Sequence, residues 1–144
     1  MAVRSATAKW SGGLKDGNGD LKLGSGAYDG QYSFTSRFED GTGTNPEELL
    51  GAAHAGCYAM ALSAGLERAG FSPESVECNA RVHLTPKEGG GFEISKVELT
   101  VDAKVPDIEE AKFMEMAEAT KETCIVSVAL GGIPVMEITA TLNA

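Results

Sequence analysis

A long segment without charged residues lies in the middle of the chain. Residues 49–66 contain no Asp, Glu, Lys or Arg, and small and apolar residues fall on every side of the helical wheel. Just before this segment, Asn45 can cap the free amides of a first turn, and Pro46 suits the first helical position. Glu48 completes a capping box. The pattern predicts a long, central, buried helix over residues 45–69, and its Ala- and Gly-rich composition is typical of a protein core rather than of a membrane span.

Alternating apolar and polar residues predict strands before this helix. Residues 5–38 contain three alternating stretches separated by glycine-rich turns, which is typical of an antiparallel meander. In the last stretch, residues 31–38, Tyr32 and Phe34 share one face and Arg37 falls on the other. We therefore expect Arg37 at the polar end of a strand that leads into the helix.

Further strands are predicted after the helix. Residues 76–84 alternate cleanly and place Cys78 on the apolar face. Residues 92–105 alternate in two phases, which a β-bulge near Ser95 would reconcile. A final strand is predicted at residues 135–142.

A second helix is predicted between these last strands. Asp107 and Glu110 match a capping box, and apolar residues follow at helical spacing as far as Ala117. The order of elements indicates an α+β fold, a single domain over residues 1–144 in which antiparallel sheets pack around the long buried helix. Because a sheet covers only one side of an uncharged helix, we expect a second subunit to cover the other side, in an intertwined homodimer.

The composition narrows the range of partners. A net charge of -9 opposes binding to nucleic acid or to an anionic membrane surface, because both require clustered Lys and Arg. The three cysteines lack the spacing of a disulfide framework or of a CxxC metal site, and the segment MAVRSATAKW lacks the apolar run of a secretory signal. We therefore expect a cytoplasmic protein without cofactor or metal, which binds neither nucleic acid nor membrane.

Cysteine is the strongest nucleophile in the chain, because neither Ser nor His has the spacing of a catalytic triad. Cys57 lies near the middle of the predicted helix, where the helix dipole gives little help and burial raises the pKa of a thiol. Such a thiol needs a nearby cation to react. Arg37 is the natural candidate, since its guanidinium can donate to a thiolate with one edge and to a carboxylate of Glu47 or Glu48 with another.

The spacing along the helix leaves the role of these acids open. Glu47 and Cys57 are ten residues apart, about 15 Å along a continuous helix. Either the helix breaks near Gly51, or Arg37 bridges between the two, or one member comes from a partner subunit. The acids would otherwise only complement the helix dipole.

The remaining candidate side chains have structural as well as functional interpretations. Cys78 is expected to be an inert core thiol. Cys124 lies either in the first turn of a new helix, where free amides stabilise a thiolate, or in the core as another buried thiol. His54 precedes Cys57 by one turn, but Zn²⁺ needs three or four ligands and His83, expected to be exposed, does not share their pattern. We therefore favour a structural histidine.

The segment RFEDGTGTNPEELLGAAHAGCYAMAL, from Arg37 to Leu62, resembles the signature segment of the OsmC/Ohr family, the osmotically inducible protein C and organic hydroperoxide resistance proteins. The motif CIVS at Cys124 and the order of elements extend the resemblance over almost the whole chain. Membership implies an OsmC-like fold in an interlocked homodimer, with active sites at the subunit interface. It also implies a thiol-dependent peroxidase of the stress response, which reduces organic hydroperoxides and, less well, hydrogen peroxide.

The resemblance implies a role for each matching residue. Cys57 matches the peroxidatic cysteine, which becomes a sulfenic acid, and Cys124 matches the resolving cysteine, which forms a disulfide with it. Arg37 matches the arginine that stabilises the thiolate, and Glu47 matches the acid that orients it. The Ohr branch carries this arginine in an early N-terminal loop, so Arg37 is similar to the OsmC branch. Ile125 stands where the family often has proline, and its amide can change the turn that presents the second cysteine.

Other functions remain as alternative hypotheses. A dithiol reductant, of the lipoyl type in some relatives, is implied as the second substrate. A non-catalytic ligand-binding or stress protein of the same fold would leave the cysteines passive, and a large separation of Cys57 from Arg37 or Cys124 would favour it. A zinc site of Cys57, His54 and Cys124 is a third hypothesis. Five aromatic residues either wall an apolar pocket or pack in the core: Tyr28, Tyr32, Phe34, Phe38 and Tyr58.

Overall fold

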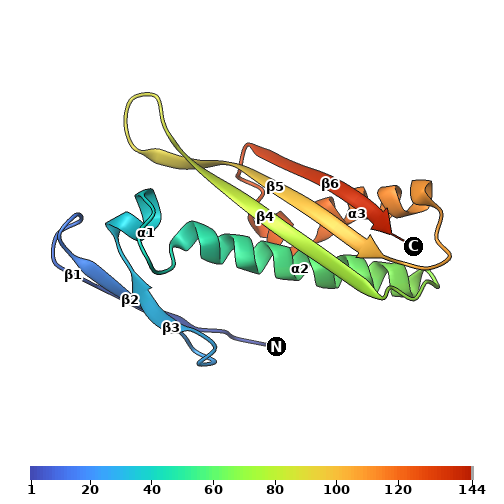
Figure 1. The fold of residues 1–144 in the computed structure, drawn as a ribbon, viewed down its shortest axis with the longest axis horizontal. Helices are drawn as coiled ribbons and strands as arrows, with labels where there is room; N and C mark the ends of the chain where they lie inside the picture. The colour runs from blue at the N-terminus through green and yellow to red at the C-terminus, as the bar shows by residue number, and fades with distance from the viewer. Residues whose placement is uncertain (144) are drawn as a thin grey trace. The chain divides into compact units, whose positions relative to one another are not determined.

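The computed structural model of the chain describes residues 1–143. It contains two compact units, one formed by residues 1–49 and the other beginning at Leu50 (Figure 1). The predicted elements are present in the predicted order, apart from the changes given below. The α+β class is confirmed, whereas the single domain over residues 1–144 stays a prediction.

The first unit contains an antiparallel meander, as the sequence predicts. Strands β1 (Ala6–Ser11), β2 (Asn18–Leu23) and β3 (Asp29–Tyr32) follow one another in space in the same order as in the chain. Trp10 and Tyr32 contact each other at 5.3 Å between ring centroids. The predicted strand over residues 31–38 is wrong, because β3 ends at Tyr32 and a short helix follows.

This short helix, α1 (Phe34–Phe38), carries Arg37 in its last turn. Ser33 caps it by accepting a hydrogen bond from the amide of Ser36, whose hydroxyl oxygen accepts one from the amide of Ser33 in return. The Ser36 hydroxyl also donates to the carbonyl oxygen of Thr44, 2.7 Å away. These bonds satisfy the backbone groups that a strand would have paired, which explains why the alternating pattern misled the prediction.

The long helix α2 (Pro46–Arg68) is continuous, so the break considered at Gly51 does not occur. The amide of Glu48 donates to Asn45 Oδ1 at 2.7 Å, which confirms the predicted N-cap. The carboxylate of Glu48 accepts a hydrogen bond from Thr44 Oγ1 instead of from the amide of Asn45, so only half of the capping box forms. The helix is long and apolar enough to cross a membrane. Core helices of soluble proteins meet the same two criteria of length and composition.

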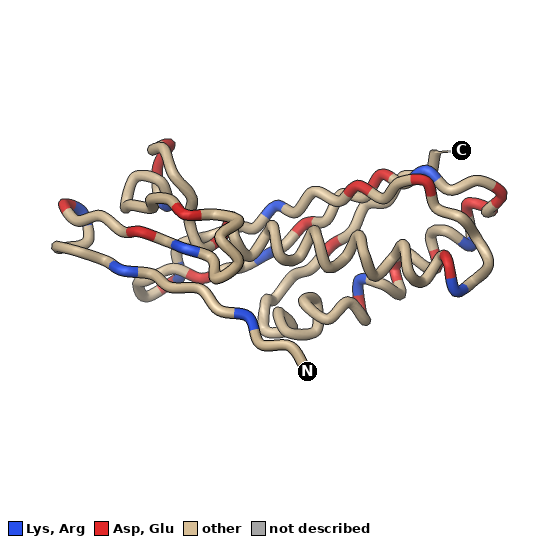
Figure 2. The backbone as a smooth tube through the Cα atoms, turned by 90° about the horizontal axis from the view of Figure 1, so that it is seen from below, with Lys and Arg blue, Asp and Glu red and all other residues tan. Residues whose placement is uncertain are grey.

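Within the single chain, α2 buries one stripe rather than its whole surface. Tyr58, Leu62 and Leu66 are fully buried, whereas Met60 on another side is 76% exposed. No charged residue lies between Glu48 and Glu67, and the tube of Figure 2 is tan there. Burial of one side by the chain itself agrees with the expectation that its sheet covers only one side of the helix. The subunit expected to cover the remainder stays a prediction.

The second unit contains a mixed sheet in the strand order β4-β5-β6. Strands β4 (Ser75–Pro86) and β5 (Phe92–Lys104) are antiparallel, but β6 (Val135–Asn143) lies parallel to β5, which corrects the expectation of antiparallel sheets only. A parallel neighbour needs a long crossover, and the helices between β5 and β6 provide it. The predicted bulge is confirmed, because pairing shifts at His83 and leaves Ser95 without an opposite residue.

Two helices, α3 (Glu110–Thr123) and α4 (Ile125–Ala129), form this crossover. Helix α3 begins two residues later than expected. Asp107 adopts a positive φ of 68° and Glu109 is the N-cap without a side-chain bond, so the second capping box is wrong. The core of the unit lies between the sheet and the helices α2 and α3 (Figure 1). It contains Tyr58, Leu62 and Leu66 of α2, alternate residues 97–103 of β5 together with Val105 just after it, and Phe113 of α3.

Candidate functional site

Two of the three cysteines lie in contact in the second unit. Cys57 projects from the middle of α2. Cys124 is both the C-cap of α3 and the N-cap of α4. Their sulfur atoms are 3.2 Å apart, although 67 residues separate them in the sequence. Cys124 is 2% exposed, whereas Cys57 is half-buried. A disulfide bond of about 2.05 Å would therefore need an approach of roughly 1.1 Å.

The surroundings of the two sulfurs make their acidities different. Burial raises the pKa of Cys57, and the amides of Val126 and Ile125 offset only part of this effect. Burial acts in the same direction on Cys124. There the amide of Ser127, the Cys57 thiol and the Ser127 hydroxyl outweigh it and lower the pKa of Cys124. In the reduced pair, Cys124 is thus the more acidic thiol within this unit.

The position of Cys124 agrees with both interpretations of the sequence, because this residue belongs to the buried core cluster and also precedes a new helix. It starts a new helix, so free amides of a first turn surround its sulfur. The thiol makes no formal capping hydrogen bond. Ile125, in the place where proline is frequent, keeps an amide that acts on Cys57.

Cys78 is the core thiol that the strand pattern predicts. It packs against the buried cluster of the second unit, from β4. Burial raises its pKa to about 11, and the charge of Cys124 adds to the effect. A thiol with that pKa is almost fully protonated at neutral pH and reacts slowly with peroxides.

Arg37 and Glu47, the other two predicted site residues, form an ion pair in the first unit. Arg37 Nη2 donates to Glu47 Oε1 at 2.7 Å, and Arg37 Nε lies 3.2 Å from both carboxylate oxygens. The Glu47 side chain is 9% exposed and that of Arg37 is 39% exposed. Among the residues that the structure describes, Nη1 of Arg37 has no hydrogen-bond partner, so one edge of the guanidinium remains available to another acceptor.

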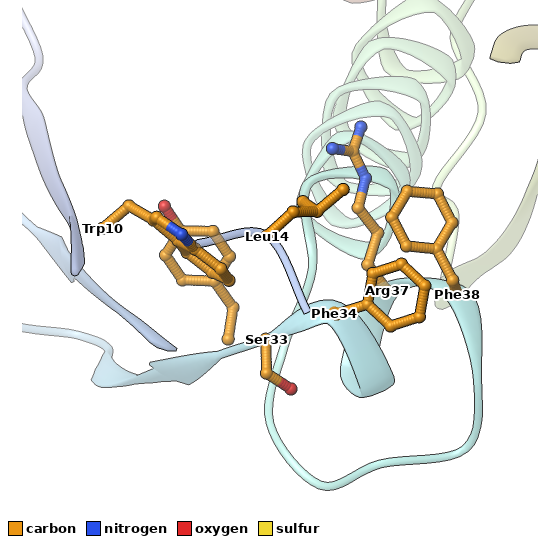
Figure 3. A pocket seen from close by; sticks show the side chains of 7 residues that line it. Trp10, Leu14, Ser33, Phe34, Arg37 and Phe38 are labelled. Carbon is orange, nitrogen blue, oxygen red and sulfur yellow. The ribbon is translucent and has the colours of Figure 1, made fainter. Parts of the chain in front are cut away.

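An apolar cavity of about 210 Å³ lies beside Arg37, within the first unit. Figure 3 shows Trp10 on one side, Phe34, Arg37 and Phe38 on the other, and Leu14 between them. The guanidinium also stacks over the Phe38 ring, at 5.3 Å from its centroid. Of the aromatic residues considered for a pocket, Tyr32, Phe34 and Phe38 line this cavity, whereas Tyr58 belongs to the core of the second unit.

Sequence reasoning overlooked one residue near the cysteines. Ser127 is 5% exposed, and its hydroxyl oxygen lies 2.7 Å from Nε2 of His54, which is fully buried. The only available signal was the spacing of three residues from Cys124. His54 thus bonds to Ser127, which agrees with the interpretation of His54 as a structural histidine. No group of three or more His, Cys, Asp or Glu side chains in residues 1–143 is arranged to hold a metal ion. His83 is half-buried and bonds to Glu98, rather than being exposed.

The chain was compared with family models, with known protein sequences and with solved structures. The family model described as OsmC-like protein matches residues 39–139. Peroxiredoxin OsmC of Escherichia coli is 43% identical over 125 residues, which cover 86% of this chain and 87% of the relative. The crystal structure of the organic hydroperoxide resistance protein OhrB of Bacillus subtilis superposes with a TM-score of 0.67 at 25% identity, covering 96% of this chain and 98% of that one.

The fold also extends to more distant structures. An OsmC-like protein from Mycoplasma pneumoniae has a TM-score of 0.76 at 14% identity, covering 99% of both chains, and so shares the architecture. The family match covers more than half of the chain and includes Cys57 and Cys124, whereas Arg37 lies two residues before its start. The chain therefore belongs to the OsmC/Ohr family.

Proposed function

We propose that this protein is a thiol peroxidase in which Cys57 attacks a hydroperoxide and Cys124 resolves the product. A peroxidase-type role, that of a peroxiredoxin-like hydroperoxide reductase, is supported by the relatives named peroxiredoxin OsmC and organic hydroperoxide resistance protein. The two-cysteine mechanism rests on one observation, the 3.2 Å between the sulfur atoms of Cys57 and Cys124. A passive role for the cysteines would not require this contact between distant segments.

The proposed reaction proceeds in two balanced steps. The Cys57 thiolate attacks the terminal oxygen of the hydroperoxide, the O–O bond breaks, and the alkoxide leaves as an alcohol after taking up a proton. Cys57 is then a sulfenic acid. The Cys124 thiolate attacks this sulfur, the S–O bond breaks, and hydroxide leaves as water after protonation. The two electrons that reduce the peroxide thus come from the two thiolates, which end as a disulfide.

Arg37 and Glu47 are proposed to activate Cys57 in the first step. A half-buried thiol whose pKa is raised by burial needs a cation to become a thiolate. Glu47 fixes the Nε and Nη2 side of the Arg37 guanidinium and leaves the Nη1 edge to a further acceptor. A guanidinium held in this way suits a thiolate and the developing charge on a peroxide oxygen.

The proposed substrates are organic hydroperoxides and, less well, hydrogen peroxide. The cavity beside Arg37 is lined mainly by Trp10, Leu14, Phe34 and Phe38, together with Tyr32. An alkyl or aryl group gains from leaving water for such walls, by about 25 cal/mol for each Å² of apolar surface. Hydrogen peroxide has no alkyl or aryl group to place in the cavity. The proposed preference for organic hydroperoxides therefore comes from this unreactive group of the substrate.

The working form is proposed to be a homodimer in the cytoplasm, reduced by a dithiol of the lipoyl type. The uncharged side of α2, with Met60 76% exposed, is apolar surface that a second copy would cover. A dithiol reopens the disulfide by thiol exchange and closes into its own disulfide, which balances the cycle.

The direct test is a free-thiol count by mass spectrometry before and after one equivalent of cumene hydroperoxide. We expect the wild type to lose two thiols and to give a Cys57–Cys124 linked peptide. Cys57→Ser and Cys124→Ser should give no such peptide, whereas the matched control Cys78→Ser should give it at the wild-type rate. Survival of all three thiols in the wild type would refute the proposed function.

A further inference from the structure

A line of two buried polar side chains, His54 and Ser127, ends at the cysteine pair. Nε2 of His54 lies 2.7 Å from the hydroxyl of Ser127, and Ser127 is the third residue of the helix that Cys124 caps. Residues at the N-cap and at the third helical position face each other across the first turn. The His54–Ser127 hydrogen bond and the 3.2 Å contact between the sulfurs meet at this turn, where the Ser127 hydroxyl interacts with the Cys124 thiol.

The orphaned nitrogen of His54 sets the direction of the hydrogen bonds. Nδ1 is buried and has no hydrogen-bond partner in the described part of the chain. Burial lowers the pKa of His54, so the ring is neutral at neutral pH and carries one proton. A proton on Nδ1 would be a buried N–H without acceptor, which costs more than an unpaired acceptor. The proton therefore belongs on Nε2, which donates to the oxygen of Ser127.

A hydroxyl that accepts from His54 keeps its own proton for another acceptor. Ser127 contains one O–H, and with its oxygen occupied by the His54 donor this proton is available to the sulfur of Cys124. The interaction of the Ser127 hydroxyl with Cys124 is one of those that lower the pKa of this thiol. The bond from His54 polarises the hydroxyl and so strengthens its donation, as happens in hydrogen-bond chains.

We propose that Ser127, held and polarised by His54, stabilises the thiolate of Cys124 and thereby sets the rate at which the Cys57 sulfenic acid is resolved. The inference rests on the proposed function and deepens it. His54 acts through Ser127 and is a positioning residue, while Ser127 contacts a reacting sulfur. The same stabilisation makes Cys124 the better leaving thiolate when a dithiol reductant opens the disulfide, which directs the reductant to Cys57.

The first experiment measures the acidity of Cys124 without any peroxide. In a Cys57→Ser background, the rate of alkylation of Cys124 by iodoacetamide is followed against pH. The other titratable groups that interact with Cys124 are Tyr58 on α2 and Cys78 on β4, and both are present in every variant. We expect Ser127→Ala and His54→Phe to raise the pKa of Cys124, and His54→Gln, which can still donate to Ser127, to restore it in large part. The matched control Thr120→Val removes another buried hydroxyl, one that bonds only within α3, and should change nothing.

The second experiment follows the sulfenic acid itself, in the full-length protein with all three cysteines. After one equivalent of cumene hydroperoxide, the Cys57 sulfenic acid is trapped with dimedone at increasing times. We expect Ser127→Ala not to slow the oxidation of Cys57 and to lengthen the lifetime of the sulfenic acid roughly 10–100-fold, the effect of losing one hydrogen bond to a charged group. His54→Phe should act in the same direction, and the double variant should match Ser127→Ala, because the two residues act in series.

The outcomes separate this inference from the proposed function. If the wild type forms neither a sulfenic acid nor a disulfide, the peroxidase proposal fails. The alkylation experiment still tests whether His54 and Ser127 stabilise the Cys124 thiolate. If Ser127→Ala folds and keeps both the wild-type pH profile of Cys124 and the wild-type lifetime of the sulfenic acid, the proposed stabilisation of Cys124 by Ser127 and His54 is refuted. Should Ser127→Ala not fold, the His54→Phe and His54→Gln pair decides, since an identical pH profile in both would equally refute it.

Discussion

The ion pair between Arg37 and Glu47 gives a prediction whose size follows from its burial. Glu47 is 9% exposed and receives contacts from two nitrogens of Arg37, which is 39% exposed. Exposed pairs are worth about 0.2–1 kcal/mol, and breaking a buried pair costs about 3–5 kcal/mol. A pair with one buried and one half-exposed member lies between these limits, so we expect a coupling energy of about 1–2 kcal/mol in folding.

Two assays on the same variants separate stability from chemistry. Urea unfolding of Arg37→Met, Glu47→Gln and the double variant gives the coupling energy as a double-mutant cycle. The rate of Cys57 oxidation by cumene hydroperoxide then measures activation. Loss of a charge-assisted hydrogen bond, worth about 1.5–3 kcal/mol, corresponds to a rate that is roughly 10–100-fold lower for Arg37→Met. We expect a smaller decrease for Glu47→Gln, because it leaves the cation but releases its orientation.

A second Arg–Glu pair serves as the matched control. Arg81 is 68% exposed and its Nη1 lies 3.9 Å from Glu98 on the outer face of the second sheet. Arg81→Met should change stability by less than about 0.5 kcal/mol and leave the oxidation rate unchanged. If Arg37→Met and Glu47→Gln behave like this control in both assays, the pair has no role in activation and our reasoning is wrong.

Three further predictions concern the second unit. Cys124→Ser should make the Cys57 sulfenic acid long-lived and abolish turnover with a dithiol, as dimedone trapping and a coupled assay will reveal. Folding raises the pKa of Cys78 from 9.0 to about 11, so the unfolded chain loses this proton first and the free energy of unfolding falls as pH rises through that interval. Cys78→Ala should weaken this fall, measured by urea unfolding at a series of pH values, without changing turnover. Tyr58→Phe removes a 2.8 Å bond to the Ala117 carbonyl oxygen and should cost about 1–2 kcal/mol in urea unfolding, and an unchanged midpoint would contradict it.

The elements that could be predicted from the sequence are those with many consistent positions. The long helix, β4 and the bulge at Ser95 each rest on a sustained pattern, and local capping residues agreed with the helix start. Helix α1 was missed because it is five residues long and its hydrogen bonds come from Ser33 and Ser36 rather than from periodicity. The parallel pairing of β6 was missed for another reason, since alternation gives the two faces of a strand but not the direction of its neighbour.

The candidate site, like the fold, contains residues that could be predicted from the sequence and others that could not. Cys57, Cys124, Arg37 and Glu47 could be named from a motif, and the two expected contacts within the units are present. The motif did not reveal that the Ser127 hydroxyl bonds to His54 and also interacts with the Cys124 thiol. That contact depends on α4 approaching α2, a long-range event to which no local pattern is linked. It was therefore accessible only from the folded chain.

In the proposed mechanism, the different acidities of the two cysteines require two separate sources of stabilisation. Within the second unit alone, Cys124 holds the lower pKa, so the pair would keep its proton on Cys57, the sulfur that we propose to attack the peroxide. A cation at Cys57, the proposed role of Arg37, moves that proton and allows the first step. Once Cys57 is a neutral sulfenic acid, the cation has no further thiolate to stabilise, and the resolving step depends on the acidity of Cys124, which Ser127 supports. The two effects should therefore separate kinetically. Arg37→Met should slow oxidation only, Ser127→Ala should slow resolution only, and the double variant should show both losses in full, each in its own step. A single variant that slowed both steps equally would mean that one shared stabiliser serves both sulfurs, and the division of labour would be wrong.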